Sequence, residues 1–152
     1  MKPVLRERLK IKTPRPPKPS SSAVTRSMQG NKASGTKPEL VLRRALRSAR
    51  IKGLRFNVKG LPGRPDVALP GQMLALFLNG CYWHRCPYCA LPMPKGNRAY
   101  WTKKFAANKL RDKKKRRRLW GLGYRILTIW ECQLKASEPK VIRRINAKLS
   151  QG

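Results

Sequence analysis

Apolar residues recur at the spacing of a helix or a strand over most of the chain beyond residue 36. Thr36-Lys37-Pro38-Glu39 has the pattern of a capping box with a proline in the first turn, which predicts that a helix begins there. We expect this helix to run to about Arg50 and to stop before Gly53. Its inner face would consist of apolar residues at helical spacing: Val41, Leu42, Ala45, Leu46 and Ala49.

Short apolar runs separated by turn residues predict a β-hairpin after this helix. Residues 54–58 have the pattern of a short strand, and residues 60–65 have the composition of a turn. Residues 66–69 and the fully apolar run 73–78 would be the two arms of the hairpin, joined by a turn at 69–72. Asp66 would therefore open one arm, and Asn79 would close the other.

Residues 80–97 show no periodicity and hold three cysteines and three prolines, so they predict a loop whose shape must be held by an external constraint. A long basic helix should follow over residues 98–121, with Trp101, Phe105, Asn108 and Asp112 on one face. Residues 124–130 alternate like a strand that ends at Glu131-Cys132. Ser137 would cap a last helix beginning at Pro139. This order predicts an α/β domain with a mixed sheet flanked by helices.

The charge of the chain narrows its possible partners. The 152 residues include 37 Lys and Arg but only 6 Asp and Glu, which gives a net charge of +31. Such a chain favours a polyanionic partner, nucleic acid above all, and is a poor fit to an acidic substrate or a membrane peptide. No apolar run approaches the roughly 18 residues that span a bilayer, so we expect no membrane partner. Residues 1–23 predict a disordered basic Pro/Ser-rich tail, either a DNA-tracking arm or a solubilising extension.

The four cysteines predict a metal site. A Cys-x2-Cys pair is a common zinc half-site, because a two-residue turn lets both thiolates reach one tetrahedral ion. The candidate ligands are Cys81, Cys86, Cys89 and Cys132. Two alternatives are a Cys3His site that uses His84, the only histidine, and buried thiols without metal. If four thiolates hold zinc, His84 is free for proton transfer.

The scarcity of acids makes each one informative. A DNA-binding surface has no use for carboxylates, whereas metal-dependent phosphodiester cleavage needs them to hold Mg²⁺. Asp66 follows Pro65 at the start of a strand, an arrangement found in nucleases whose first acid follows a proline. Simpler interpretations are that Glu39 only caps its helix and that Asp112 only pairs with nearby cations. Glu131 is interpreted as a structural acid.

Several blocks together resemble the very short patch repair (Vsr) DNA mismatch endonucleases. They are residues 25–28, 36–40, 61–66, 80–87, Tyr100-Trp101 with Lys104, Asn108 and Arg111-Asp112, 123–127 and 130–132. The resemblance spans about residues 24–135. It implies a restriction-endonuclease-like α/β fold with a structural zinc site, and a Vsr-like endonuclease domain over residues 24–152. The activity it implies is a strand-specific nick 5′ of the thymine in a T:G mismatch left by 5-methylcytosine deamination.

The resemblance also implies roles for individual residues. Asp66 matches the metal-binding catalytic Asp, with the carbonyl of Leu78 as a second Mg²⁺ contact. His84 matches a general acid–base, and Glu39 and Asp112 match acids that support it or a metal-bound water. The four cysteines match zinc ligands. The remaining matched positions would contact or wedge into the mismatch: Met28, Tyr82, Trp83, Trp101, Lys104 and Asn108. For the three aromatic residues, core packing is the alternative.

Two departures from the family pattern are visible. Many members have Asp where this chain has Asn79, and Asn supplies no negative ligand, so we expect metal affinity or rate to differ. The stretch between Met28 and Glu39 is also somewhat short. The implied context is a bacterial, cytoplasmic, nucleoid-associated monomer that acts on double-stranded DNA, alongside a cytosine-5 methyltransferase and a repair polymerase and ligase. The rival functions are a restriction or defence-type nicking enzyme of the same fold, and a non-catalytic nucleic-acid-binding zinc protein.

Overall fold

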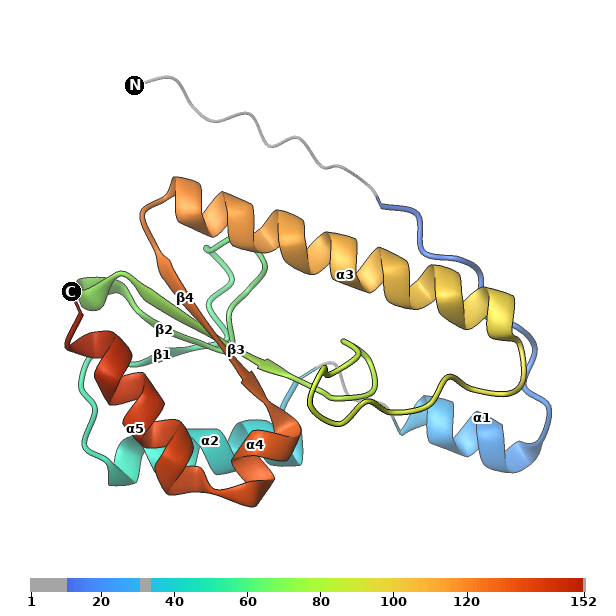
Figure 1. Ribbon diagram of the computed structural model, residues 1–152, viewed down its shortest axis with the longest axis horizontal. Helices are drawn as coiled ribbons and strands as arrows, with labels where there is room; N and C mark the ends of the chain where they lie inside the picture. Colours follow the sequence, from blue (N-terminus) through green and yellow to red (C-terminus); the bar gives the residue numbers. More distant parts are fainter. Residues whose placement is uncertain (1–10, 31–33, 152) are drawn as a thin grey trace.

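The computed structural model describes residues 11–30 and 34–151 (Figure 1). Their helices are α1 (Ser22–Gln29), α2 (Lys37–Ser48), α3 (Arg98–Gly121), α4 (Glu131–Ala136) and α5 (Glu138–Leu149), with a short 3-10 turn at Pro70–Gln72. Their strands are β1 (Arg55–Phe56), β2 (Val67–Leu69), β3 (Leu74–Asn79) and β4 (Arg125–Trp130). The predicted α/β class with a mixed sheet is therefore confirmed.

The four strands form one sheet in the order β1-β2-β3-β4. The predicted hairpin is present, since β2 and β3 pair antiparallel with Ala68 opposite Ala75. β4 then pairs parallel to β3, with Leu76 opposite Leu127, after the chain has passed through α3. A parallel pair requires such a long crossover, so the length of α3 is part of the topology.

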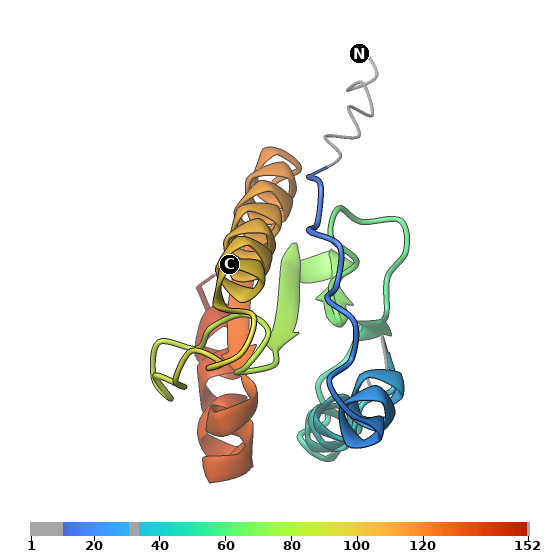
Figure 2. The same ribbon diagram turned by 90° about the vertical axis from the view of Figure 1, so that its right-hand side faces the viewer.

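Helices cover both faces of the sheet, with α3 on one side and α2, α4 and α5 on the other (Figures 1 and 2). Alternate residues of β3 point to opposite faces, as in any strand. Leu74 and Leu76 belong to the main core under α2 and α5, whereas Ala75 packs with Leu119 of α3 in a smaller second cluster. The main core is completed by side chains from three helices: Leu42, Leu46, Leu134, Val141 and Ile145.

α3 buries few of its side chains. Phe105 and Ala107 pack in its first half and Leu119 in its last turn, while the segment between them keeps partial or full exposure. Its 24 residues cover about 36 Å at the helical rise. α3 therefore crosses the sheet with few fully buried side chains in its second half before the last turn.

Several local predictions require correction. The strand after α3 ends at Trp130, and Glu131 and Cys132 lie in the first turn of α4, which the sequence pattern did not indicate. The capping box at Thr36 forms in altered shape, because the Glu39 carboxylate accepts from Gly35 N–H at 2.9 Å and from the Thr36 hydroxyl at 3.1 Å. α5 begins at Glu138, with the Ser137 hydroxyl accepting from Lys140 N–H as the predicted cap.

The N-terminal segment lies beside α3. Residues 11–21 form no helix or strand, and α1 begins at Ser22, inside the predicted tail. Ile11 shares a cavity wall with Gly63 and Arg111, and Figure 2 shows this segment descending past α3. Residues 1–10 of the predicted tail lie outside the described part. No helix within residues 11–30 and 34–151 is both long and apolar enough to cross a membrane.

Candidate active site

An open cleft of about 640 Å³ lies where the start of α2, the end of β3 and the middle of α3 meet. Asp66 reaches it from the residue before β2, and His84 reaches it from the cysteine loop, residues 80–97. The fold brings together every residue that was predicted to act in catalysis: Glu39, Asp66, Leu78, His84 and Asp112. These residues come from five different segments, so only the tertiary structure assembles them.

Asp66 is held by the neighbouring strand. Its Oδ2 accepts a hydrogen bond of 2.7 Å from the N–H of Leu78 in β3. Burial is the largest influence on this carboxyl and raises its pKa above the ordinary value for Asp. The negative charge of Glu39 raises the pKa further, while the Leu78 hydrogen bond and the charge of His84 act against the rise. The Asp66 carboxylate is therefore a constrained, partly desolvated anion.

His84 and Asp112 form a tightly coupled pair across the cleft. His84 Nδ1 lies 2.5 Å from Asp112 Oδ2, and the Asp112 side chain is 15% exposed. Burial alone would raise the pKa of Asp112, but the hydrogen bond to His84 and the charges of His84, Lys115 and Arg116 outweigh it and lower the pKa. An ionised Asp112 favours the proton on Nδ1, which leaves Nε2 as the nitrogen able to accept one.

The cleft also contains residues beyond the predicted catalytic set. Glu131, interpreted as purely structural, lines the cleft and pairs with Lys135 at 2.9 Å. Lys115 lines it from α3, one turn beyond Asp112. Lys115 lies three residues after Asp112, a spacing that places both on the same face of a helix. The run of six consecutive cations hid this relation, because the sequence alone does not show which of them faces the cleft. Asn79, the departure from the family pattern, is buried on the cleft wall at the end of β3.

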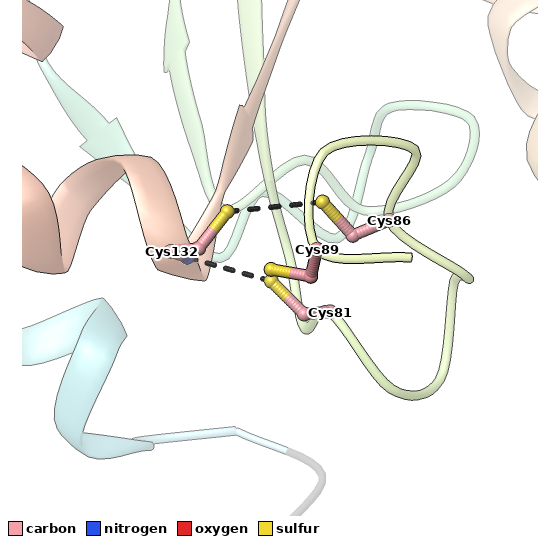
Figure 3. A group of neighbouring side chains, drawn as sticks. All are labelled: Cys81, Cys86, Cys89 and Cys132. Carbon is pink, nitrogen blue, oxygen red and sulfur yellow. Dashed lines mark hydrogen bonds between the residues drawn. The ribbon is translucent and has the colours of Figure 1, made fainter. Parts of the chain in front are cut away.

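The four cysteine sulfurs converge at one point beside the cleft (Figure 3). Three come from the cysteine loop and Cys132 comes from the start of α4, so the cluster joins the loop to the sheet. All four Sγ atoms lie within 4.8 Å of one another, and those of Cys86 and Cys132 are 3.7 Å apart. The cluster excludes His84, whose Nδ1 faces Asp112 instead. A metal ion could be held by these four thiols.

The predicted mismatch-contacting aromatic residues pack together on the flank of the cleft. The ring centroid of Tyr82 lies 5.1 Å from that of Trp83, and the ring of Trp101 stacks on buried Phe105 at 5.4 Å. Tyr82, Trp83 and Trp101 all remain half-buried. They are therefore packed against one another while still presenting part of each ring to solvent.

Two polar residues of α3 are tied to this aromatic cluster. Lys104 Nζ donates to the Tyr100 hydroxyl at 2.9 Å and lies 5.7 Å from the centre of the Trp83 ring. Asn108 Nδ2 donates to the Trp83 carbonyl at 2.9 Å. The predicted DNA-contacting residues of α3 thus face the same side as the cysteine loop. The side chain of Met28 lies outside the described residues.

Comparison with known proteins finds a matching family and several relatives. Residues 20–89 match the family described as DNA mismatch endonuclease Vsr. The chain is 38% identical over 109 residues to the type II nicking enzyme V.XorIIP of Xanthomonas oryzae pv. oryzae, covering 70% of this chain and 78% of that one. It is 37% identical over 123 residues to the type II nicking enzyme V.NaeI of Lentzea aerocolonigenes, covering 76% and 71%. It is 32% identical over 102 residues to the DNA mismatch endonuclease Vsr of Escherichia coli K12, covering 66% and 65%.

The acid-lined cleft and these relatives define the class of the protein, which is that of DNA endonucleases. Within this class the chain belongs to the Vsr DNA mismatch endonuclease family. The predicted family is therefore confirmed, and the interpretation as a non-catalytic zinc protein is set aside. DNA is its substrate.

Proposed function

We propose that the protein nicks one strand of duplex DNA on the 5′ side of the thymine in a T:G mismatch, by Mg²⁺-dependent hydrolysis. The observation that carries the proposal is the convergence of Glu39, Asp66 and the His84–Asp112 pair in one cleft of a protein with a net charge of +31. The catalytic domain would span residues 24–152. The acid before the first arm of the hairpin and the parallel β4 support a restriction-endonuclease-like fold.

The cysteine cluster fits Zn²⁺. Tetrahedral zinc with bonds of about 2.3 Å places its sulfurs about 3.8 Å apart. The 3.7 Å between Cys86 and Cys132 and the 4.8 Å limit for all four are close to that geometry. The N–H of Cys132 donates to Cys81 Sγ at 3.4 Å, a contact typical of thiolate ligands. Bound zinc would fix the cysteine loop and, with it, the position of His84.

The acid side of the cleft fits Mg²⁺. Asp66 carries a buried carboxylate near the negative charge of Glu39, a combination that a divalent cation would relieve. Hard oxygen ligands are those that Mg²⁺ prefers, and Asp66 with the Leu78 carbonyl would hold it. Bound Mg²⁺ supplies Lewis-acid stabilisation of charge on the phosphate oxygens.

The His84–Asp112 pair supplies the proton chemistry. Asp112 holds the Nδ1 proton of His84, so Nε2 takes a proton from the attacking water as its oxygen bonds to phosphorus. The bond from phosphorus to the 3′ oxygen breaks, its electron pair stays on that oxygen, and a proton completes the 3′-hydroxyl. The phosphate remains on the 5′ end. Asp112 also stabilises the imidazolium formed during the transfer.

The half-buried aromatic rings would select the substrate. A T:G wobble pair stacks poorly, so opening the stack there costs less than at a matched pair. Tyr82, Trp83 and Trp101 present ring surface beside the cleft, where apolar wedges could enter the stack. Lys104 and Asn108 lie next to them with groups that pair with exposed base edges. Met28 would contact the mismatch from the other side.

One alternative target has its own support. V.XorIIP and V.NaeI are named type II nicking enzymes, so a nicking enzyme of the same fold with another recognition site is the second candidate. If the protein acts on T:G mismatches, a cytosine-5 methyltransferase would produce the 5-methylcytosine from which they arise at the bacterial nucleoid. A repair polymerase and ligase would then complete the repair.

A nick assay separates these functions. Purified protein is incubated with matched, T:G and other mismatched duplexes, with Mg²⁺ or with EDTA. We expect Mg²⁺-dependent nicking of the T strand in the T:G duplex only. Asp66→Asn should bind that duplex and fail to nick it, since the amide keeps the Leu78 hydrogen bond and loses the charge. Equal nicking of matched DNA, or nicking by Asp66→Asn, would contradict the proposal.

A further inference from the structure

Lys115 stands at the border between the acidic cleft and a cationic cavity. On one side it shares the cleft wall with Asp66, His84 and Asp112. On the other side it lines a cavity of about 120 Å³ whose remaining polar lining is cationic: Arg111, Lys114 and Arg118. A backbone phosphate beside the reacting groups would meet Lys115 first among the cations of α3.

The stem of Lys115 is fixed by a close approach to the turn before Asp66. A Cβ added to Gly63 would lie 2.9 Å from Cβ, Cγ and Cδ of Lys115, a separation that real Cβ atoms do not show. Gly63 also has φ of +80°, a conformation that L side chains rarely adopt. Glycine at this position therefore lets α3 approach the turn closely enough for the Lys115 stem to lie on it.

The ammonium of Lys115 is near Asp112 but is not bonded to it. Its Nζ lies 3.8 Å from Asp112 Oδ1, which is longer than a hydrogen bond, and Asp112 Oδ2 faces His84 at 2.5 Å. Asp112 therefore attracts the ammonium without using one of its three donors. The side chain is 41% exposed, so those donors can reach a ligand in the cleft.

We propose that Lys115 is a substrate-contacting residue that binds the phosphate being cleaved and stabilises the charge it gains in the transition state. This inference rests on the proposed function, because it places the scissile phosphate in the same cleft. Hydrolysis leaves more negative charge on the phosphate oxygens in the transition state than in the substrate. A fixed ammonium there acts on the rate, whereas a cation elsewhere on α3 acts only on affinity.

A coupling experiment tests this contact without requiring cleavage. Lys115→Met removes the ammonium and keeps a stem that packs on Gly63. Lys113→Met is the matched control, since it removes the same charge from an exposed position outside the cleft lining. Each protein is titrated in EDTA with T:G duplexes carrying one neutral methylphosphonate, moved in turn through the linkages around the mismatched thymine.

We expect Lys115→Met to lose about 10- to 100-fold in affinity for the all-phosphate duplex. That loss should vanish when the neutral linkage lies 5′ of the thymine, because the contact is then already missing. Lys113→Met should lose the same factor on every duplex. A Lys115→Met loss that is equal on all duplexes, or that vanishes at a different linkage, would overturn the inference.

Nicking of the unmodified T:G duplex provides the second readout. At saturating protein with Mg²⁺, Lys115→Met should slow the single-turnover rate by about 100-fold, and Lys113→Met should leave it within about twofold. Coupling at the expected linkage without any nicking by the wild-type protein would support the Lys115 contact and refute the proposed function. Nicking by the wild-type protein without coupling would support the proposed function and refute the Lys115 contact. An unchanged rate for Lys115→Met would also refute the catalytic part.

Discussion

The polar side chains of the cleft are held by partners that also set their charge. Asp66 is bonded to the Leu78 N–H, and Asp112 is bonded to His84. Burial raises the pKa of Asp66, whereas the hydrogen bond and positive charges around Asp112 outweigh burial and lower its pKa. Asp66 is an anion that the fold tolerates poorly, whereas Asp112 is an anion that the fold supports. Under the proposed function, Asp66 would bind the divalent cation and Asp112 would support the proton transfer of His84.

The unfavourable buried charge of Asp66 predicts an effect on stability. Asp66→Asn should raise the Tm of the metal-free protein at neutral pH, since it removes a buried charge beside Glu39. Adding Mg²⁺ should raise the Tm of the wild-type protein and not that of the variant. Thermal melts of both proteins in EDTA and in Mg²⁺ measure this. Equal responses of the two proteins to Mg²⁺ would show that Asp66 does not hold the ion.

Asp112 predicts a dependence of stability on pH. Its pKa is lowered by folding, so its contribution is present above the unfolded value of about 3.9 and is lost as the pH falls through the folded value. Asp112→Asn should therefore lower the free energy of unfolding by about 1 kcal/mol at pH 7 and by much less at about pH 3. Urea unfolding of both proteins at the two pH values gives the difference. A deficit that persists undiminished in acid would contradict it.

At the scale of elements, the site is formed by a regular helix, α3, and by the irregular cysteine loop. α3 buries Phe105 and Leu119, and the segment between them presents Asp112 and Lys115 to the cleft. The cysteine loop has little regular structure, and three of its thiols converge with that of Cys132 at the start of α4. The hydrogen bond between His84 and Asp112 connects the cysteine loop to α3.

Much of this architecture was predictable where the pattern is long. α2, the β2–β3 hairpin, α3 and β4 were found because periodicity and turn residues extend over enough of the chain. α4 escaped because six residues with one buried apolar side chain, Leu134, carry no detectable period. The catalytic set came from the resemblance together with the scarcity of acids. Lys115 and Glu131 became visible only when the fold showed which side chains face the cleft.

The proposed zinc site predicts a loss of activity when one of its cysteine ligands is replaced. Cys86→Ser should lose bound zinc, measured by elemental analysis, and should nick T:G DNA at least about 100-fold more slowly, because His84 is no longer held against Asp112. Tyr88→Ser is the matched control, since Tyr88 is exposed and lies between two of the cysteines. A Cys86→Ser protein that folds and nicks normally without zinc would refute a structural metal.

At the scale of the whole molecule, the two signs of charge are separated. Residues 95–118 hold 12 Lys or Arg and the single acid Asp112. Among the described residues, four of the five acids line the cleft, and Glu138 pairs with Arg44 elsewhere. The surface would attract a DNA backbone broadly, while the centre would repel a phosphate until cations are present. Under the proposed function, the cations around the site would provide affinity and a divalent ion would offset the acids within it.

This arrangement predicts a steep salt dependence. Each phosphate neutralised contributes about −0.9 to the slope of log affinity against log salt, so we expect a slope of about −5 or steeper. Fluorescence anisotropy with a T:G duplex at several salt concentrations measures it. Deleting residues 1–20 should make the slope shallower, because it removes seven Lys and Arg that can neutralise phosphates. A nearly flat slope would refute backbone binding by these cations.

The position of His84 within the cysteine loop has a consequence for how the protein matures. The only histidine of the chain lies between Cys81 and Cys86, so the same six-residue span carries two of the proposed zinc ligands and the proposed proton carrier. A newly synthesised chain would be unable to cut until the ion had been captured and the loop closed. Under the proposed zinc site, metal loading is a built-in delay that protects chromosomal DNA from an incompletely folded nuclease.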